Sequence, residues 1–214
     1  MKEDIKQKII EDGRLLKNYH PEKYGLNQPI RELFNCYDLT RIHEIYKSDF
    51  DVLTFETDQS TIFHKKFYAM SRDSEFYKRP LFNEKILYQK VPTFRTQVPN
   101  NLGVAEWHCD ADYNHAEEEW NIFLPLTKAY DTNTIWAESK PGKEDYTPMN
   151  AQVGDYYFWQ GSKLRHGNKT NDTKKSRVSI DFRVMPYSHY KENDRTSTSN
   201  KTKMTIGHYF EICE

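Results

Sequence analysis

The strongest constraint on the fold lies in the second half of the chain, where short apolar segments follow one another from Pro92 onward. Each has alternating or continuous apolar character, which is typical of β-strands. Gly, Pro, Asn and Asp residues separate them, as turns require. The segments read TFRTQV, VAEWHCD, EWNIFLPLT, TIWAES, MNAQV, DYYFWQG, RVSIDFRVMP and KMTIGHYFEI. About eight short strands of this kind predict a jelly-roll or double-stranded β-helix.

The first ninety residues have a different pattern, with apolar residues at helical spacing. Ile5, Ile9 and Leu16 recur at this spacing, and a second apolar series runs from Ile30 to Tyr46 just after a proline that suits a helix start. A third helix is predicted over STIFHKKFYAM, with Ser60 as its N-cap, and a fourth over SEFYKRPLFNEKILYQKV. Helices therefore precede the strands.

These two patterns predict the organisation of the whole chain. Its length suits one ordinary domain that can bury a sizeable core, so we predict a single domain over 1–214. Within it, 1–91 are expected to be mostly helical support, and 92–214 to form a mainly β, cupin-like double-stranded β-helix core backed by these helices. The polar run at 189–203 is expected to be a loop on this core, and it could act as a lid.

Composition narrows the possible partners. The 31 basic and 32 acidic residues give a net charge of −1, so the composition predicts no general electrostatic attraction to nucleic acid or to an anionic membrane. A small-molecule partner agrees better with this charge. The three cysteines show no CxxC-type spacing, so neither a disulfide framework nor a structural zinc site is indicated. The charged N-terminal segment lacks the apolar core of a signal peptide, which favours a cytoplasmic protein.

The stretch EWHCDADYNH contains the residue types of a metal site. His108 and Asp110 are two positions apart at what reads as a strand end, so their side chains leave on the same side. His166, which follows the segment DYYFWQG, is the candidate third ligand. Two imidazoles and one carboxylate leave the other positions of an ion open, as in non-haem Fe(II) centres that activate oxygen. We expect no catalytic group beyond these three ligands.

A polar strand face follows the third candidate ligand. In RVSIDFRV, apolar residues alternate with polar ones that include Arg177 and Ser179. The polar face could point to solvent from a half-exposed strand. It could instead point into the barrel, where a guanidinium and a hydroxyl can bind a carboxylate through charge-assisted hydrogen bonds.

Taken together, His108-x-Asp110, His166 and Arg177-x-Ser179 resemble the iron(II)/2-oxoglutarate-dependent oxygenases, which share the double-stranded β-helix fold. The resemblance covers roughly Phe94 to Pro186. The run FRTQVPNNLGVAEWHCDADYNHAEEEWNIFLPLT is similar to a small branch near the phytanoyl-type hydroxylases that includes proteins of streptomycin-type aminoglycoside biosynthesis. The resemblance implies Fe(II), 2-oxoglutarate and O2, with the arginine and the serine on the distal carboxylate of 2-oxoglutarate.

Five further polar residues have suggested roles. The resemblance implies that Asn121 and Gln97 contact 2-oxoglutarate and that Arg95, on the same strand face as Gln97, lines the pocket as a candidate for substrate contact. Arg165 and Asn168 are candidates for substrate contacts because they flank His166. Ordinary packing is the alternative for each of them: Asn121 could be a satisfied polar residue within a strand, and Gln97 and Arg95 could be part of the barrel wall.

The activity implied by the resemblance is hydroxylation of a small polar metabolite in a biosynthetic or tailoring role, with release of succinate and carbon dioxide. Asp110 fills the carboxylate position that similar halogenases leave to a small residue, so a hydroxylase is expected rather than a halogenase. Two alternatives stay open: a cupin-like metal enzyme that does not use 2-oxoglutarate, and a non-catalytic jelly-roll binding module. The oligomeric state does not follow from the sequence.

Overall fold

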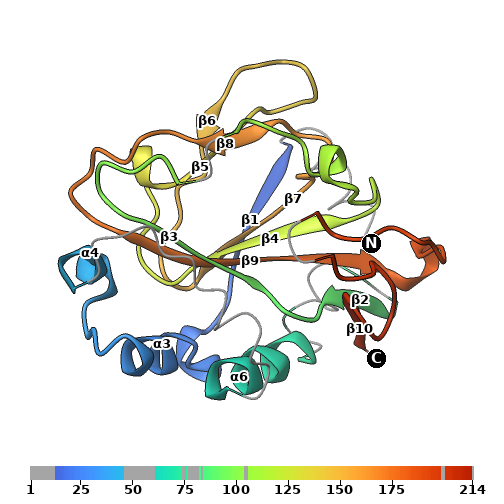
Figure 1. The fold of residues 1–214 in the computed structure, drawn as a ribbon, viewed down its shortest axis with the longest axis horizontal. Coiled ribbons are helices and arrows are strands. Elements are labelled where there is room, and N and C mark those ends of the chain that lie inside the picture. The colour runs from blue at the N-terminus through green and yellow to red at the C-terminus, as the bar shows by residue number, and fades with distance from the viewer. Residues whose placement is uncertain are drawn as a thin grey trace.

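Two antiparallel β-sheets face each other, with helices on the outer side of the larger one (Figure 1). The computed structural model describes residues 13–45, 61–73, 76, 82, 84–103, 106–198 and 201–213. In the larger sheet the strand order is β1-β7-β4-β9-β2-β10, and β3 also pairs with β9. The smaller sheet has the order β6-β5-β8. This is the mainly β, double-stranded β-helix architecture that the sequence predicts.

The bounds of the strands follow the chain order. They are β1 (Arg14–Asn18), β2 (Ile86–Gln89), β3 (Thr93–Gln97), β4 (Trp120–Pro125), β5 (Ile135–Ala137), β6 (Thr147–Pro148), β7 (Asp155–Trp159), β8 (His166–Asn168), β9 (Arg177–Pro186) and β10 (Phe210–Cys213). The segments predicted around β3, β4, β5, β7, β9 and β10 are therefore strands. In VAEWHCD and MNAQV, by contrast, the described residues make only isolated bridges, His108 to His166 and Ala151 to Ala129.

Strand β9 divides the interior in two. It is ten residues long, so one edge pairs with β4 while the other pairs first with β3 and then with β2. Its apolar side chains are fully buried in the core on the helical side: Val178, Ile180, Phe182 and Val184. Its polar side chains point the other way, toward the smaller sheet: Arg177, Ser179, Asp181 and Arg183. The period of two thus separates a dry core from a polar interior.

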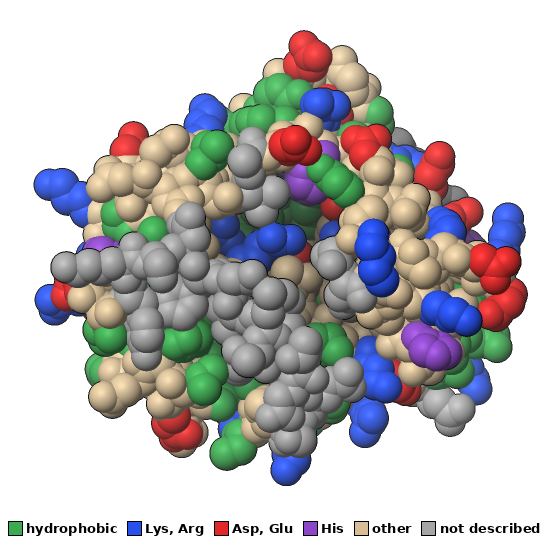
Figure 2. Space-filling view, viewed as in Figure 1, with side chains coloured by type: hydrophobic (Ala, Val, Ile, Leu, Met, Phe, Trp, Pro, Cys, Tyr) green, Lys and Arg blue, Asp and Glu red, His purple; other side chains and the backbone are tan. Residues whose placement is uncertain are grey.

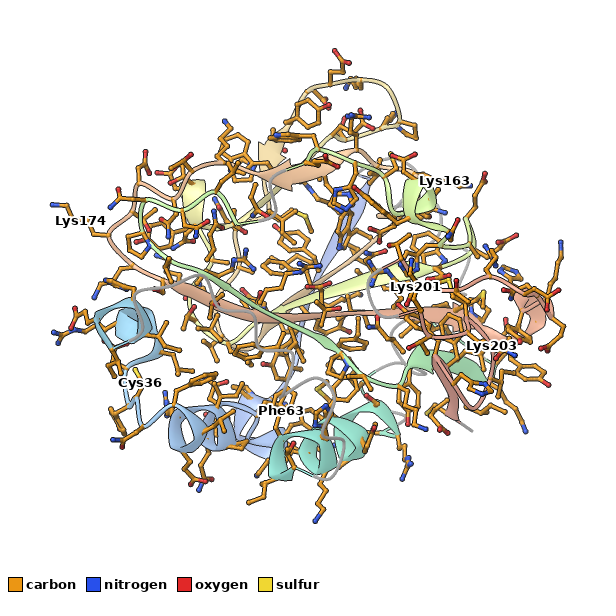
Figure 3. All side chains as sticks on the ribbon, viewed as in Figure 1. Cys36, Phe63, Lys163, Lys174, Lys201 and Lys203 are labelled. Carbon is orange, nitrogen blue, oxygen red and sulfur yellow. The ribbon has the colours of Figure 1, made fainter. Side chains whose placement is uncertain are left out.

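The helices cover the dry side of the larger sheet. They are α2 (Pro21–Tyr24), α3 (Asn27–Leu33), α4 (Ile42–Ile45) and α6 (Ile62–Ser71). Elsewhere the chain forms short 3-10 turns, η1 (Leu39–Arg41), η2 (Asp110–Tyr113), η3 (Asp131–Asn133) and η4 (Tyr187–His189). Phe63 on α6 points into the core between helix and sheet (Figure 3). None of the helices that the structure describes combines the length and the apolar character needed to cross a membrane.

Two of the four predicted helices differ from the expectation in their bounds. The helix predicted over 60–70 is α6, and its N-cap is Thr61, whose hydroxyl accepts from the His64 N–H at 3.2 Å. Ser60 lies outside the described residues. The long helix expected from residue 30 to residue 46 is wrong, because α3 ends at Leu33. Asn35 then adopts a left-handed φ of 45°, which stops a helix, and a separate short helix α4 follows.

Two stretches expected to be helical contain strands instead. Leu16 lies in β1, which pairs antiparallel with β7, while Ile5 and Ile9 lie outside the described residues. The fourth predicted helix is wrong at its end, because Ile86–Gln89 forms β2 between β9 and β10. A short apolar run fits a buried helix or a buried strand equally well, and here the open edge of β9 decides for the strand.

The polar loop that follows β9 is held against the turn at residues 110–114. The Arg195 guanidinium donates to the backbone oxygen of Asn114 at 3.2 Å, and the Asn114 amide donates back to that of Thr196 at 3.3 Å. An isolated bridge joins Thr196 to Lys203 and closes the loop on itself. The loop is therefore tied to the segment that carries Asp110.

Candidate metal centre

The three candidate ligands lie together between the two sheets. Backbone hydrogen bonds of 2.9 Å in both directions join His108 to His166, the first residue of β8, and bring their ring centroids to 4.4 Å. Asp110 opens the turn η2, and its Oδ1 lies 3.6 Å from His108 Nε2 and 3.7 Å from His166 Nε2. One potential ligand atom from each residue lies within 4.8 Å of the others.

Backbone carbonyls fix the orientation of both imidazoles. The Nδ1 of His108 pairs with the carbonyl oxygen of Glu106 at 2.9 Å, and that of His166 with the carbonyl oxygen of Leu164 at 2.9 Å. A carbonyl can only accept, so in the neutral rings Nδ1 carries the hydrogen. Each Nε2 then presents a lone pair toward Asp110, which is the tautomer that a metal ligand needs.

The carboxylate of Asp110 uses its two oxygens differently. Its Oδ2 accepts from the Asn121 amide at 2.7 Å and from Nε and Nη2 of Arg183 at 3.1 and 2.9 Å. The side chain is almost fully buried, so these bonds replace water at Oδ2. Oδ1 is left facing the two imidazoles. One oxygen and two nitrogens therefore converge on one point, an arrangement that fits a metal held on one face.

The charge states of these groups suit metal binding. Burial alone would raise the pKa of Asp110, but Arg183, His108 and His166 outweigh it and hold that pKa well below its usual range. Burial lowers the pKa of His166 to about 4, so the ring is neutral at pH 7. Burial also lowers the pKa of His108, but the nearby Asp110 carboxylate and the hydrogen bond with the Glu106 carbonyl raise it overall. A metal ligand must be deprotonated at Nε2, so metal binding at His108 would compete with protonation of that ring.

A glycine allows Asn121 to approach Asp110. A Cβ on Gly161 would lie 2.7 Å from atoms of the Asn121 side-chain amide, far inside normal contact distance. We expect Gly161→Ala to push that amide away from Asp110 and to lower the free energy of unfolding by about 1–3 kcal/mol, as overpacking usually does. Urea unfolding of the apo-protein measures this effect. The double variant Gly161→Ala/Asn121→Ala should be less destabilised than the sum of its single variants, and strict additivity would contradict the steric explanation.

A second cluster surrounds Arg177, which is 1% exposed. Its guanidinium donates to the Asn133 carbonyl oxygen at 2.9 Å, to Ser179 Oγ at 2.5 Å and to Gln97 Oε1 at 3.2 Å. All three acceptors are neutral, and no carboxylate of the described residues forms a salt bridge with Arg177. Burial, followed by the charge of Arg95, lowers the pKa of Arg177 to about 10, so the group is still a cation at pH 7. A buried cation without a counter-ion favours an anionic ligand.

The other predicted site residues divide between these clusters and the fold. Asn121 lies beside Asp110, not in the cluster around Arg177. Asn168 is buried and donates to Gln97 Oε1 at 3.2 Å and to the Thr134 carbonyl at 3.1 Å. Arg165 is exposed. The amide group of Asn168 therefore donates its hydrogen bonds within the fold, and Arg165 lies at the surface.

Two residues at the site carry roles that the sequence did not indicate. Arg183 pairs with Asp110, and it also donates to Gln89 Oε1 at 3.3 Å and to the Tyr209 hydroxyl at 3.4 Å. The alternation along β9 puts it on the polar face, but nothing in the sequence connects it to Asp110. Glu119 is 1% exposed and accepts from His115 Nδ1 at 2.7 Å.

No protein-family model matches the chain. The streptomycin biosynthesis protein StrG of Streptomyces griseus is 39% identical over 167 residues, which cover 75% of this chain and 80% of StrG. Both shares exceed two thirds, so this similarity extends over most of both proteins.

Several solved structures share the fold at low sequence identity. EctD from S. alaskensis with 2-oxoglutarate and 5-hydroxyectoine has a TM-score of 0.62 and 12% identity, over 90% of this chain and 78% of EctD. CytC3 with Fe(II) and alpha-ketoglutarate has a TM-score of 0.55 and 14% identity, over 87% of this chain and 77% of CytC3. AviO1 from Streptomyces viridochromogenes Tue57 has a TM-score of 0.56 and 15% identity, over 87% of this chain and 96% of AviO1.

These similarities agree with the resemblance found in the sequence. The structures of EctD and CytC3 contain 2-oxoglutarate, and that of CytC3 also contains Fe(II). The chain belongs to the family of the streptomycin biosynthesis protein StrG, and its fold is that of the iron(II)/2-oxoglutarate-dependent oxygenases.

Proposed function

We propose that this protein is a non-haem iron(II)- and 2-oxoglutarate-dependent dioxygenase that acts on a small molecule. One observation carries the proposal: a cluster of two histidines and one carboxylate shares an interior with Arg177, a buried cation that lacks a counter-ion among the described residues. A metal site alone would not need such a cation. A metal that works with a dicarboxylate co-substrate would.

The residues divide the binding tasks. His108, Asp110 and His166 would hold Fe(II) on one face and leave the remaining positions for 2-oxoglutarate and O2. Arg177 and Ser179 would bind the distal carboxylate. When bound, iron and 2-oxoglutarate supply the oxidising chemistry, in which 2-oxoglutarate is converted to succinate and carbon dioxide while O2 is activated.

The protein contributes orientation and a shielded interior. Gln97 accepts from Arg177 at 3.2 Å and would hold its guanidinium ready for a carboxylate. Phe123 lies under this guanidinium at 5.7 Å, and the Trp159 ring packs edge-on against His166 at 4.7 Å. These aromatic walls exclude water, which strengthens the charged interactions inside the site.

The finer assignment is hydroxylation of a small polar metabolite. Asp110 would supply the third protein ligand, so no ligand position on the protein side would be left for a halide. The relative's name, a streptomycin biosynthesis protein, supports a biosynthetic or tailoring role. We propose the same kind of role for this chain in the cytoplasm.

Anaerobic titration of the apo-protein with Fe(II) and 2-oxoglutarate tests the proposal. We expect a visible charge-transfer band when both are present, and slow formation of succinate after a pulse of oxygen. His108→Ala should abolish both signals, because the metal loses one of three ligands. The matched control is His189→Ala, which removes an exposed histidine of η4 and should leave both unchanged.

The same titration separates the alternatives. Iron binding without the band or succinate would favour a cupin-like metal enzyme that does not use 2-oxoglutarate. If His108→Ala and the wild-type protein bind equally little iron, the fold is used as a binding module and the proposed function is wrong.

A further inference from the structure

We propose that the substrate carries an anionic group, a carboxylate or a phosphate, and that Arg95 binds it while Asp181 positions Arg95. This inference rests on the proposed function, and it names the chemical class of the substrate at the same site. Three observations support it: the hydrogen bonds of Arg95, the exposure of its side chain, and the balance of charges around the site.

Arg95 lies on the same interior face as the cluster around Arg177. In the antiparallel register of β3 and β9, Arg95 is opposite Ser179 and Gln97 is opposite Arg177. Two residues further along β9, Asp181 accepts from Arg95 Nε through its Oδ1 at 2.7 Å. The side chain of Arg95 therefore projects toward the space between the sheets.

The guanidinium of Arg95 keeps donors available. Only its Nε is engaged, and within the described part of the chain Nη1 and Nη2 donate no hydrogen bond. Its side chain is 36% exposed, whereas Arg177 and Arg183 are buried and use their guanidinium groups within the fold. Two parallel N–H groups on an accessible guanidinium match the geometry of a carboxylate or a phosphate.

Arg95 lies within electrostatic reach of both halves of the site. After burial, its charge is the largest cause that lowers the pKa of Arg177, and it is also among the charges that act on His108. Figure 2 shows a hollow near the centre of this face with Lys or Arg side chains on its floor and a histidine on its wall. A group bound by Arg95 would thus lie close to the metal ligands and to the proposed co-substrate.

The charge balance favours an anion over a cation. Arg183 is paired with Asp110 and Arg95 with Asp181, and the distal carboxylate of 2-oxoglutarate would neutralise Arg177. Fe(II) then adds two positive charges and the remaining carboxylate of 2-oxoglutarate removes one. These three arginines and two aspartates, together with Fe(II) and 2-oxoglutarate, would carry one net positive charge, which attracts an anionic substrate and repels a cationic one.

Asp181 is better placed to orient Arg95 than to bind a substrate. Its side chain is only 11% exposed, and its Oδ1 already accepts from Arg95. Asparagine can accept from the same Nε without the negative charge. Asp181→Asn should therefore keep the orientation of Arg95 and strengthen anion binding severalfold. If the Arg95–Asp181 ion pair were purely structural, the same substitution would not strengthen anion binding.

The test uses four small probes on the anaerobic complex with Fe(II) and saturating 2-oxoglutarate. The probes are acetate, methylphosphonate, tetramethylammonium and acetamide, at constant ionic strength. Broadening of their methyl proton NMR signals by the paramagnetic iron reports binding near the metal. The proteins compared are the wild type, Arg95→Gln, Arg95→Lys, Asp181→Asn and the surface control Arg41→Gln, whose arginine pairs with Glu44.

We expect acetate or methylphosphonate to bind the wild type and Arg41→Gln with equal affinity. The affinity should be lower by a factor of about ten or more in Arg95→Gln and intermediate in Arg95→Lys. The stronger of the two probes identifies a carboxylate or a phosphate as the recognised group. Acetamide and tetramethylammonium should not bind.

Each other outcome overturns the inference. Anion binding that does not depend on Arg95 would mean direct binding to iron, and preferential binding of tetramethylammonium would make Asp181 the recognition group. Absence of binding by every probe would also refute it. The charge-transfer band distinguishes failure of the proposed function from failure of this inference. Absence of the band in the wild type refutes the proposed function. If the band is present but the probes do not bind as expected, only the assignment of Arg95 is refuted. Loss of the band in Arg95→Gln alone would assign Arg95 to the co-substrate.

Discussion

Replacement of Arg177 by methionine should abolish productive binding of 2-oxoglutarate while leaving the protein folded and able to bind iron. We expect the affinity for 2-oxoglutarate to fall by about 3 kcal/mol, or about 100-fold, because the distal carboxylate would lose its charged partner in a buried site. Methionine fills a similar volume and removes the buried cation. Calorimetric titration with 2-oxoglutarate and with Fe(II), each followed separately, measures the two affinities.

Thermal stability gives an independent measure of the same change. Without ligand, the three neutral acceptors around Arg177 lose their donor, but the desolvation of a cation is also relieved, so the apo-protein should melt within a few degrees of the wild type. A ligand that binds only the folded state raises the melting temperature of the protein. The increase caused by 2-oxoglutarate should vanish in Arg177→Met. Arg177→Lys, which keeps the charge, should recover part of it. Equal loss of iron affinity would show that Arg177 supports the metal instead.

Replacement of Arg183 by methionine should have the largest effect on stability. Arg183 is the cation that pairs with the buried Asp110, and Asp110 also depends on it for two of the three hydrogen bonds to Oδ2. Removal of one partner leaves an uncompensated buried charge, so we expect the apo-protein to lose about 3–5 kcal/mol of its free energy of unfolding at pH 7. Urea denaturation at several pH values measures the loss.

The dependence on pH should change sign in this variant. In the wild type the pKa of Asp110 is depressed, so its contribution to stability is present above the unfolded value of about 4 and is lost only as the pH falls further. Without Arg183, burial raises that pKa above the unfolded value, and the protonated form becomes the favourable one. The destabilisation relative to the wild type should therefore shrink as the pH is lowered from 7 to 5.

A double variant provides the control for this explanation. In Asp110→Asn the buried charge is absent, so adding Arg183→Met should cost much less than it does in the wild-type background. The difference between the two backgrounds is the coupling of the pair. An additive result, or a loss in Arg183→Met that is constant between pH 5 and 7, would mean that Arg183 acts through packing and not through Asp110.

The sequence predicted the β-rich half better than the helical half, and the reason is physical. Strand β9 shows strict alternation over its first eight residues, Arg177 to Val184, because its two faces meet different surroundings. The segment Ile86–Gln89 carries no such signal, since all four residues are buried and a run of that length fits a helix or a strand. Likewise, the three-residue strand β8 is too short to predict, although it carries His166.

The sequence by itself determined which chemical groups the site contains. The spacing of His108 and Asp110, a later histidine, and the polar face of β9 with Arg177 were all readable as residue types in order along the chain. Those features depend on local geometry, because neighbours two apart in an extended segment share a side whatever the rest of the fold does.

Only the tertiary structure decided what each group does. Asn121 and Arg183 meet Asp110 from two neighbouring strands, Arg95 meets Asp181 across the β3–β9 pair, and Arg177 is left without a counter-ion among the described residues. The partner of a buried charge is set by strand register and by which face is enclosed. These depend on contacts between segments far apart in the chain, which residue order alone does not encode in a readable form.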